Sequence, residues 1–551
     1  MSNYSKHKNT LTKAIEMKKK RGFWSPYPEM PSERVYGENG KELASKEFES
    51  FLNNTFEIEG IEDKQYVSEE TSPFGFNLGI TYPSLEKSNI IKRSKTAMKE
   101  WAKVTLDDKA GICLEILDRL NKNSFLIANT VMHTTGQPYI MAFQAGAPHA
   151  QDRGLEAIAY AYDMLSAIPT SAIFEKPQGK NPPIVIDKKY KIVPKGVSLV
   201  ITCSTFPTWN SYSAIFASLM CGNSVVYKPH EKAILPIALS TKIIREVLQE
   251  NNINPDLCLM ALMEEKKDTQ DLATHKDIQI IDFTGSTQFG DWLEQNATQA
   301  SVYTEKAGVN SIVISDFNDT KGMCRNISFA LSLYSSQMCT APQNIFIPKE
   351  GILVDGEQIS FDAIASMITS SIEKLLGDEQ RAVEILGAIQ SEDTLGRVAD
   401  ATKIGEVLLE SKSINHPSFK NARVKTPLVL KLNSKDESLY MREYFGPIVL
   451  LIECESKEDS LACFEKTLAT QGAITAGVYA KDPSFIEEVE DIACRCRVNL
   501  SENLTGAILM NHSAAFSDFH ASGANKAANC SLVNEDFISK RYTVVTIKKD
   551  A

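Results

Sequence analysis

"GVSLVITCSTFPTWNSYSAIFASLMCGNSVVYKP", Gly196–Pro229, is the stretch of sequence that decides the fold. It holds a short apolar run, a helical pattern that stops at Gly222, and a second short apolar run. Short apolar runs bounded by turn residues are typical of buried strands, and glycine commonly ends a helix. A strand, a helix and a second strand in this order predict neighbouring strands of a mainly parallel sheet with a helix packed against it.

The same alternation continues towards the C-terminus. It runs through a helix "LPIALSTKIIREVLQEN", strands "CLMALM" and "IQIIDFTGS", and a helix that opens at "QFGDWLEQNA". A second alternating stretch runs from residue 311 to about residue 511. The chain of 551 residues is too long for one ordinary core. We therefore predict an α/β protein with more than one domain, whose ligands bind at the carboxyl ends of the parallel strands.

The flanking segments differ from this core. Residues 1–87 are polar and turn-rich, which indicates an N-terminal extension draped over the body. Apolar alternations broken by proline and glycine at about 172–196 predict a projecting β-hairpin. The C-terminal return, 512–551, contains "YTVVTIKK", a strand without a local partner, which we expect to pair with the hairpin of a neighbouring subunit. Between these segments we predict a cofactor domain over 88–310, interrupted by the hairpin, and a catalytic domain over 311–511.

Composition and charge exclude several classes of protein. The net charge of −11 argues against a nucleic-acid-binding protein. No signal peptide or membrane-length apolar segment is seen, and the eleven scattered cysteines suit a reducing compartment, so we expect a cytoplasmic protein. Cys494 and Cys496 have no second pair beside them, so no metal site is predicted. The basic run Lys18–Arg21 is interpreted as a solvated helix end.

Three strand-end loops and one cysteine are the places where chemistry is expected. The loops are "STFPTWN" (204–210), "KPHE" (228–231) and "FTGSTQFG" (283–290), and the last is a small-residue turn that can offer backbone N–H groups to a phosphate. The common GxGxxG dinucleotide fingerprint is absent. Cys339 lies in "SLYSSQMCTAPQNIFIP", and an isolated cysteine of this kind is more often a buried apolar residue than a nucleophile.

Taken in order, these segments resemble the aldehyde dehydrogenase superfamily from about Ser88 to Gly523. The glutamate–glycine segment of that family is matched by "TEKAGVNSIVI" and its Gln-x-Cys segment by "SQMCTAP". The resemblance implies a general base at Glu305 and a nucleophile at Cys339, 34 residues later. It also implies a Rossmann-like cofactor domain, an α/β catalytic domain and a β-hairpin arm used for oligomerisation.

The resemblance also assigns the cofactor-binding residues. "REYFGPI" matches the family's Glu-x-Phe-Gly-Pro element and implies that Glu443 and Phe445 contact the nicotinamide ribose and ring. Lys228 and Glu231 are implied at the adenosine ribose. Gly285 and Ser286 are implied at the pyrophosphate.

The implied cofactor is NAD or NADP. Glu231 favours a ribose with two free hydroxyls and repels a 2′-phosphate, so NAD is slightly favoured. His230 and Lys232 beside it can soften that repulsion, which leaves NADP open.

These residues predict a covalent mechanism. The thiolate of Cys339 attacks an aldehyde to give a thiohemiacetal, and loss of hydride leaves a thioester. Water activated by Glu305 then releases a free acid. Thr205 replaces the asparagine that the family uses as an oxyanion donor, so either Thr205 or Asn210 is expected to stabilise the oxyanion.

A narrower resemblance covers nearly the whole chain. "FWSPYPE", "SPFGFNLGITYP" and "CSTFPTWNSY" are similar to the PaaN-type branch, associated with phenylacetic acid degradation. That branch implies a ring-opened, CoA-linked semialdehyde as the substrate and a homodimer or homotetramer, with no nucleic-acid or membrane partner.

Two other functions stay open, and two histidines are interpreted as structural or unassigned. The alternatives are a thioester hydrolase that uses the same thiol without redox chemistry, and a non-catalytic scaffold of a degradation complex.

His149 is interpreted as a structural partner of Asp152. His520 stands where the family usually has lysine, and no function is assigned to it.

Overall fold

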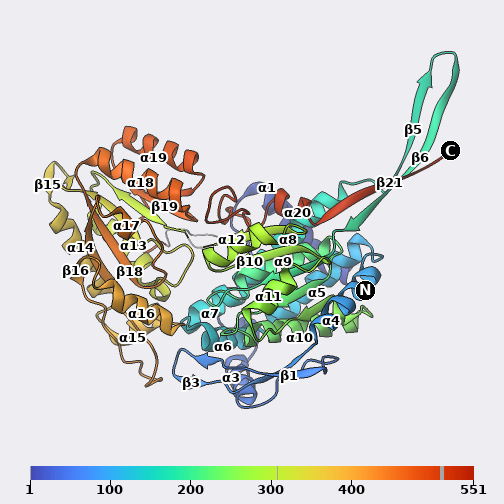
Figure 1. Ribbon diagram of the computed structural model, residues 1–551, viewed down its shortest axis with the longest axis horizontal. Helices are drawn as coiled ribbons and strands as arrows, with labels where there is room; N and C mark the ends of the chain where they lie inside the picture. The colour runs from blue at the N-terminus through green and yellow to red at the C-terminus, as the bar shows by residue number, and fades with distance from the viewer. Residues whose placement is uncertain (1, 307, 509–513, 551) are drawn as a thin grey trace.

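The computed structural model describes residues 2–306, 308–508 and 514–550. Two β-sheets wrapped by helices make up the body, and a narrow arm extends from it (Figure 1). The first sheet has five parallel strands in the order β11-β10-β7-β8-β9. Their bounds are β7 (Val197–Ile201), β8 (Val225–Lys228), β9 (Cys258–Met260), β10 (Ile278–Thr284) and β11 (Ser301–Glu305).

Helices cover both faces of this sheet, as the alternating pattern predicts. The crossover helices are α9 (Trp209–Met220), α10 (Leu235–Glu250), α11 (Lys266–Ala273) and α12 (Thr287–Asn296), with the short helix η1 (Pro255–Leu257) before β9. The helical region before the hairpin forms α4 (Lys87–Trp101), α5 (Leu106–Lys122), α6 (Ser124–Thr135), α7 (Tyr139–Gly146) and α8 (Pro148–Ser166). Every residue of β7 is buried, which explains why its sequence is a continuous apolar run and not an alternating one.

The second sheet has seven strands in the order β16-β17-β18-β13-β12-β19-β20, and β16 is antiparallel to β17. The strands are β12 (Ser311–Ile314), β13 (Asn344–Pro348), β16 (Glu406–Leu409), β17 (Leu428–Asn433), β18 (Ile448–Cys454), β19 (Thr475–Tyr479) and β20 (Asn499–Glu502). The helices beside them are α13 (Thr320–Ser332), η2 (Leu333–Ser336), α14 (Phe361–Leu375), α15 (Glu379–Leu386), α16 (Glu392–Ala401), α17 (Glu437–Tyr440), α18 (Lys457–Gln471) and α19 (Pro483–Cys496), and β14 (Ile352–Val354) forms a small hairpin with β15 (Glu357–Ile359). The predicted boundary between residues 511 and 512 lies outside the described residues.

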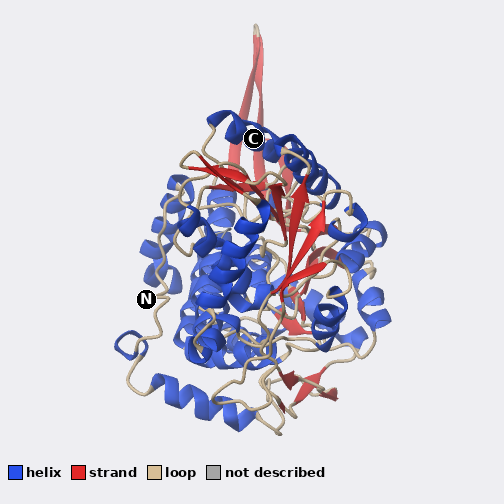
Figure 2. Ribbon diagram, turned by 90° about the vertical axis from the view of Figure 1, so that its left-hand side faces the viewer, coloured by secondary structure: helices blue, strands red, loops and turns tan. Residues whose placement is uncertain are grey.

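The projecting arm is a three-stranded antiparallel sheet. The predicted hairpin is present as β5 (Ser171–Gln178) and β6 (Asn181–Pro194), and it stands away from the body in two views (Figures 1 and 2). The tail strand β21 (Tyr542–Asp550) pairs with β6 of the same chain. The expectation that it pairs with a neighbouring subunit's hairpin is therefore wrong.

Arg541 explains why the tail strand returns to its own hairpin. Its guanidinium is fully buried and donates to both carboxylate oxygens of Asp282 on β10, at 2.9 and 2.5 Å. The rings of Tyr303 and Phe537 flank it. Since a buried charge needs its partner, this ion pair fixes the start of β21 beside the base of β6. The short helix α20 (Glu535–Ser539) leads into it.

The N-terminal extension is more helical than its polar sequence indicates. It contains α1 (Asn3–Lys20), α2 (Glu33–Tyr36), α3 (Gly40–Phe51) and the short strands β1 (Lys64–Val67), β2 (Thr71–Ser72), β3 (Phe76–Asn77) and β4 (Thr81–Ser84). The basic run does end a helix, but it is not solvated throughout. Lys18 is buried against Asp163 at 2.7 Å, and Arg21 stacks on Phe519. The extension thus contacts the C-terminal return.

A helix that crosses a membrane has to be both long and apolar. Among the described residues, no helix combines the length and apolar character needed to cross a bilayer.

Candidate active site

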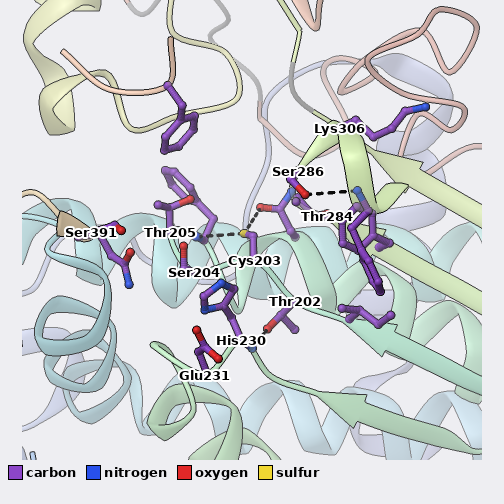
Figure 3. A pocket seen from close by; sticks show the side chains of 18 of the residues that line it. Thr202, Cys203, Ser204, Thr205, His230, Glu231, Thr284, Ser286, Lys306 and Ser391 are labelled. Carbon is purple, nitrogen blue, oxygen red and sulfur yellow. Dashed lines mark hydrogen bonds between the residues drawn. The ribbon is translucent and has the colours of Figure 1, made fainter. Parts of the chain in front are cut away.

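The nine predicted site residues line one cavity of about 620 Å³. The cavity lies where the carboxyl ends of β7, β8 and β10 meet loops of the second sheet, and Figure 3 shows side chains from three of these strand ends around it. The nine residues are Thr205, Lys228, Glu231, Gly285, Ser286, Glu305, Cys339, Glu443 and Phe445. The outermost of these residues are more than 200 positions apart in the sequence, and the fold brings all nine to one cavity.

The loop that carries Cys339 has an unusual backbone. Tyr334, Ser335 and Ser336 all have positive φ, at 52°, 50° and 53°. Non-glycine residues rarely adopt this left-handed conformation, at a cost of about 1–3 kcal/mol each. The hydroxyl groups of all three donate to main-chain carbonyls, and Asn310 donates to the carbonyl of Cys339 at 2.7 Å. The tight turn places the thiol at the cavity.

Glu305 ends β11 and is almost completely buried. Asn210, at the start of α9, donates to its Oε2 atom at 3.2 Å. Burial alone raises the pKa of a carboxyl, but the nearby His520 and the interactions with Cys339 and Asn210 outweigh it and lower the pKa of Glu305 below 4.5. The side chain is therefore an anion.

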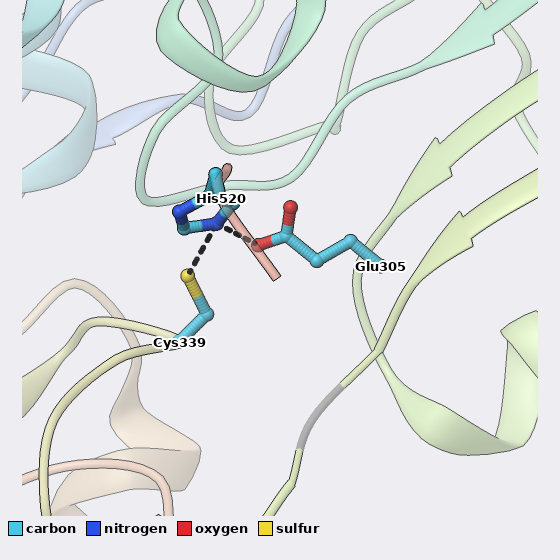
Figure 4. Close-up of side chains that lie close together, drawn as sticks. All are labelled: Glu305, Cys339 and His520. Carbon is cyan, nitrogen blue, oxygen red and sulfur yellow. Dashed lines mark hydrogen bonds and ion pairs between the residues drawn. The ribbon is translucent and has the colours of Figure 1, made fainter. Parts of the chain in front are cut away.

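His520 lies between the two predicted catalytic residues. Its Nε2 atom is 3.9 Å from Cys339 Sγ and 3.3 Å from Glu305 Oε1 (Figure 4). The ring packs edge-on against Trp209, with ring centroids 4.7 Å apart. Sequence reasoning assigns no role to His520. One side-chain atom from each of Glu305, Cys339 and His520 lies within 4.8 Å of the other two, and atoms of these types can bind a metal ion. The predicted absence of a metal site therefore stays a prediction.

Burial raises the pKa of the Cys339 thiol well above 9, and the charge of Glu305 raises it further. A cysteine in this setting stays protonated at neutral pH unless another group takes its proton. The group that does so has to be in contact with the sulfur.

Thr205 and Asn210, the two predicted oxyanion donors, both line the cavity, and the choice between them stays a prediction. The Asn210 amide donates to Glu305, and its carbonyl faces the Cys203 thiol at 3.6 Å. Thr205 lines the cavity, and its carbonyl is fixed by Gln137 at 2.7 Å. Cys203 is a second thiol at the cavity that the sequence did not single out, and burial raises its pKa to about 11.

The turn after β10 provides a helix N-terminus. Ser286 is the N-cap of α12, and its hydroxyl accepts from the backbone N–H of Phe289 at 3.4 Å. A Cβ added to Gly285 would lie 2.7 Å from the ring of Phe283. Only glycine therefore fits here unless that ring moves, and the backbone of the turn borders the cavity, as a site for a phosphate requires.

The turn after β8 carries Lys228 and Glu231. Burial lowers the pKa of Lys228, while the charge of Glu231 opposes that shift. Burial, aided by the charges of the two flanking lysines, lowers the pKa of His230 to about 4, so this ring is neutral. Lys232 donates to Ser391 at 3.1 Å. His230 thus offers no positive charge beside Glu231, whereas Lys232 keeps its charge.

Glu443 and Phe445 reach the cavity from the second sheet. Burial raises the pKa of Glu443 to about 7, and the charge of Arg397 opposes the shift. Arg397 on α16 donates to the carbonyl of Phe445, and Gln343 accepts from the N–H of Tyr444 at 2.6 Å. Sequence reasoning missed Arg397, since nothing in the α16 pattern marks it as a cavity residue.

The predicted partner of His149 is wrong. His149 pairs with Glu29 of the N-terminal extension at 2.8 Å, while Asp152 accepts from Ser25 at 2.7 Å. Both contacts tie the extension to α8, a role that α8 alone does not reveal.

Comparison with known proteins agrees with this geometry. The family model described as "Aldehyde dehydrogenase family" matches residues 83–537. The chain belongs to the aldehyde dehydrogenase family. A crystal structure of an NAD-dependent aldehyde dehydrogenase from Burkholderia multivorans has a TM-score of 0.98 and 47% identity, covering 100% of this chain and 99% of its own.

Curated relatives of this family member are more distant. Aldehyde dehydrogenase family 7 member B4 of Arabidopsis thaliana is 23% identical over 304 residues, which cover 53% of this chain and 56% of the plant protein. The chain thus spans little more than half the length of that relative. Benzaldehyde dehydrogenase YfmT of Bacillus subtilis (strain 168) is 23% identical over 407 residues, covering 72% and 77% of the two chains.

Family membership confirms the predicted superfamily and α/β fold. It agrees with the prediction of an oxidoreductase that uses NAD or NADP, since the Burkholderia relative is described as NAD-dependent. None of these relatives is named as a PaaN-type protein, so that branch stays a prediction.

Proposed function

We propose that this protein oxidises an aldehyde to the carboxylic acid with NAD or NADP, through a covalent intermediate on Cys339. The observation that carries the proposal is one cavity lined by a thiol, a buried carboxylate and a set of dinucleotide-binding groups. A thioester hydrolase or a scaffold has no use for the last of these.

The hydrogen-bonding groups around the cavity suit a dinucleotide. The N-terminus of α12 suits the pyrophosphate, and the carboxylates of Glu231 and Glu443 suit the hydroxyls of the two riboses. NAD is slightly favoured over NADP, because the charge of Glu231 repels a 2′-phosphate and the neutral His230 does not offset it, although the charge of Lys232 leaves NADP open. When bound, the cofactor supplies the acceptor for the hydride of the substrate carbon.

The chain's own residues perform the remaining steps. The Cys339 thiolate adds to the carbonyl carbon, and the hydroxyl of Thr205 donates to the oxygen that becomes negative. The oxidised carbon remains on the sulfur as a thioester. Glu305 takes a proton from the water that attacks this thioester, so the product is a free acid and the thiolate leaves.

Glu443 makes cofactor binding depend on pH. With a pKa of about 7, its carboxyl is neutral at lower pH and a strong acceptor for ribose hydroxyls at higher pH. We expect the Kd of NAD to fall about threefold to tenfold as pH rises from about 6 to about 8, measured by calorimetry. In Glu443→Gln the Kd is expected to stay flat over this range, since His230 is already neutral there. The same dependence in the variant would contradict the assignment.

For the substrate, we propose a ring-opened, CoA-linked semialdehyde of phenylacetate catabolism. The support is the resemblance of "FWSPYPE" and "CSTFPTWNSY" to the PaaN-type branch. The eleven free cysteines also fit a cytoplasmic enzyme.

We further propose that the protein is a homodimer or homotetramer that associates through the arm. Apolar side chains on the arm are exposed, and an uncovered sheet of this kind invites pairing. They are Ile173, Ile184, Val185, Val193, Val544, Val545 and Ile547.

The proposed function is tested by following reduced nicotinamide during incubation with NAD or NADP and a panel of semialdehydes, both free and CoA-linked. We expect turnover with NAD and preference for the CoA-linked compounds. Cofactor binding without turnover of any aldehyde would contradict the substrate, and failure to bind either cofactor would overturn the whole function.

A further inference from the structure

The two groups that lie beside His520 Nε2, Cys339 and Glu305, are reacting groups of the proposed mechanism. The side chain of His520 is about 2% exposed, and its Nε2 atom faces the Cys339 sulfur on one side and Glu305 Oε1 on the other. Within the described residues, His520 Nδ1 makes no hydrogen bond, while Glu305 Oε1 is paired with Nε2 at 3.3 Å. Buried polar atoms normally have partners, so an unsatisfied ring nitrogen beside a nucleophile indicates a site built for chemistry.

We infer that His520 takes the proton of the Cys339 thiol, and that Glu305 holds the resulting imidazolium in place. The inference rests on the proposed function, because it assigns the first step of that reaction. The S–H bond breaks, and its proton moves to Nε2, while Nδ1 keeps its own proton. The electron pair left on sulfur forms the C–S bond as the carbonyl π pair moves to oxygen. When the thioester is hydrolysed, that pair returns to sulfur beside the imidazolium.

Glu305 is poorly suited to take the thiol proton itself. Its pKa lies below 4.5, while burial and the negative charge of Glu305 raise that of Cys339 well above 9. An anion next to the sulfur opposes formation of a second anion. An imidazole in contact with both groups makes the second anion easier to form, because the protonated imidazole attracts both the thiolate and the carboxylate. Glu305 then remains available for water.

The surroundings hold His520 in this position. The backbone N–H of Phe516 donates to Glu156 at 3.1 Å, and Asn499 donates to the carbonyl of Phe519 at 2.9 Å. Both contacts fix the irregular loop just before His520 in the chain. Trp209 covers the ring edge-on, with ring centroids 4.7 Å apart.

The charges near His520 are accounted for. Glu305 from β11 and the Cys339 thiol are the titratable groups in contact with it. Behind Trp209, on α8, the Arg153 guanidinium lies 5.3 Å from the indole centroid. Its charge is matched by Glu156 at 2.9 Å and by Asp518 at 3.4 Å. Within the part of the chain that the structure describes, the charge of Arg153 is thus matched and does not compete with the imidazolium.

The test is the rate at which iodoacetamide alkylates Cys339 across a pH series, measured by mass spectrometry of its peptide in the full-length enzyme without cofactor. Only the thiolate reacts. We expect wild type to react rapidly at neutral pH, and His520→Gln to react at least about tenfold more slowly there and to recover as pH rises. Cys494 is exposed in the same chain and serves as an internal control whose rate stays unchanged.

Two further variants separate the possible roles. His520→Lys keeps a cation beside the sulfur and is expected to react faster than His520→Gln, so equal rates would contradict the ion pair. If Glu305→Gln slows alkylation and His520→Gln does not, Glu305 is the base and the inference fails. Thermal unfolding checks that each variant folds, and His520→Asn replaces His520→Gln if that variant does not fold. Because the assay needs no aldehyde, a wrong substrate proposal leaves its outcome unchanged.

Discussion

Replacement of Cys339 by alanine is expected to abolish aldehyde oxidation, with a fall in kcat of at least about 10⁴-fold. The thiol is the nucleophile, and without it no thiohemiacetal forms and the hydride has no route off the substrate. The measurement is formation of reduced nicotinamide with an aldehyde that the wild-type enzyme turns over. Cofactor affinity is expected to be unchanged, because Cys339 projects from a loop fixed by main-chain contacts and not by its sulfur.

The matched control for this variant is Cys494→Ala, which removes an exposed thiol on α19. It is expected to retain full activity. Residual turnover in Cys339→Ala above a hundredth of the wild-type rate would mean that another group carries the substrate, and Cys203, the second thiol at the cavity, would be examined next.

Replacement of Glu305 by glutamine is expected to stop the reaction halfway. Addition to the aldehyde and hydride loss still occur, so one equivalent of reduced cofactor per active site appears in a rapid burst. Hydrolysis of the thioester then lacks its base, and the steady-state rate falls about 10²- to 10⁴-fold. Intact-protein mass spectrometry is expected to find the acyl group retained on Cys339.

Glutamine keeps the shape of the side chain and can still contact Asn210, so the change removes the charge with little repacking. A variant that turns over at the wild-type rate would show that water is activated elsewhere. A variant that yields neither burst nor turnover would place Glu305 in the first half of the reaction, against the proposed division of labour.

The sequence predicts the first sheet well because its strands are buried on both faces. Continuous apolar runs such as β7 leave little choice of structure, and the loops at their ends are then fixed in space. Glu305 and Cys339 are predicted from two short motifs of the aldehyde dehydrogenase family, which this chain carries 34 residues apart. The cavity brings them together as expected.

What the sequence missed depends on long-range contacts. His520 reaches Cys339 from an irregular loop 181 residues away, and no periodic pattern marks such a residue. Only the basic end of α1 is indicated by the sequence, because few residues of this helix are buried. The sequence predicts the tail strand, but that strand is equally suited to either hairpin, and buried contacts such as that between Arg541 and Asp282 favour its own.

That contact also sets the order in which the protein can be completed during synthesis. A ribosome that has made the five strands of the first sheet has produced the Asp282 carboxylate in the core, but not the guanidinium that matches it, which comes more than 230 residues after β11. The first sheet is therefore made before the second but is completed only when the tail has been made. Until residue 541 emerges, the nascent chain carries an uncompensated charge inside its largest core and an unpaired edge on β6. Chaperones that shield such surfaces therefore have the longest access to this half of the molecule.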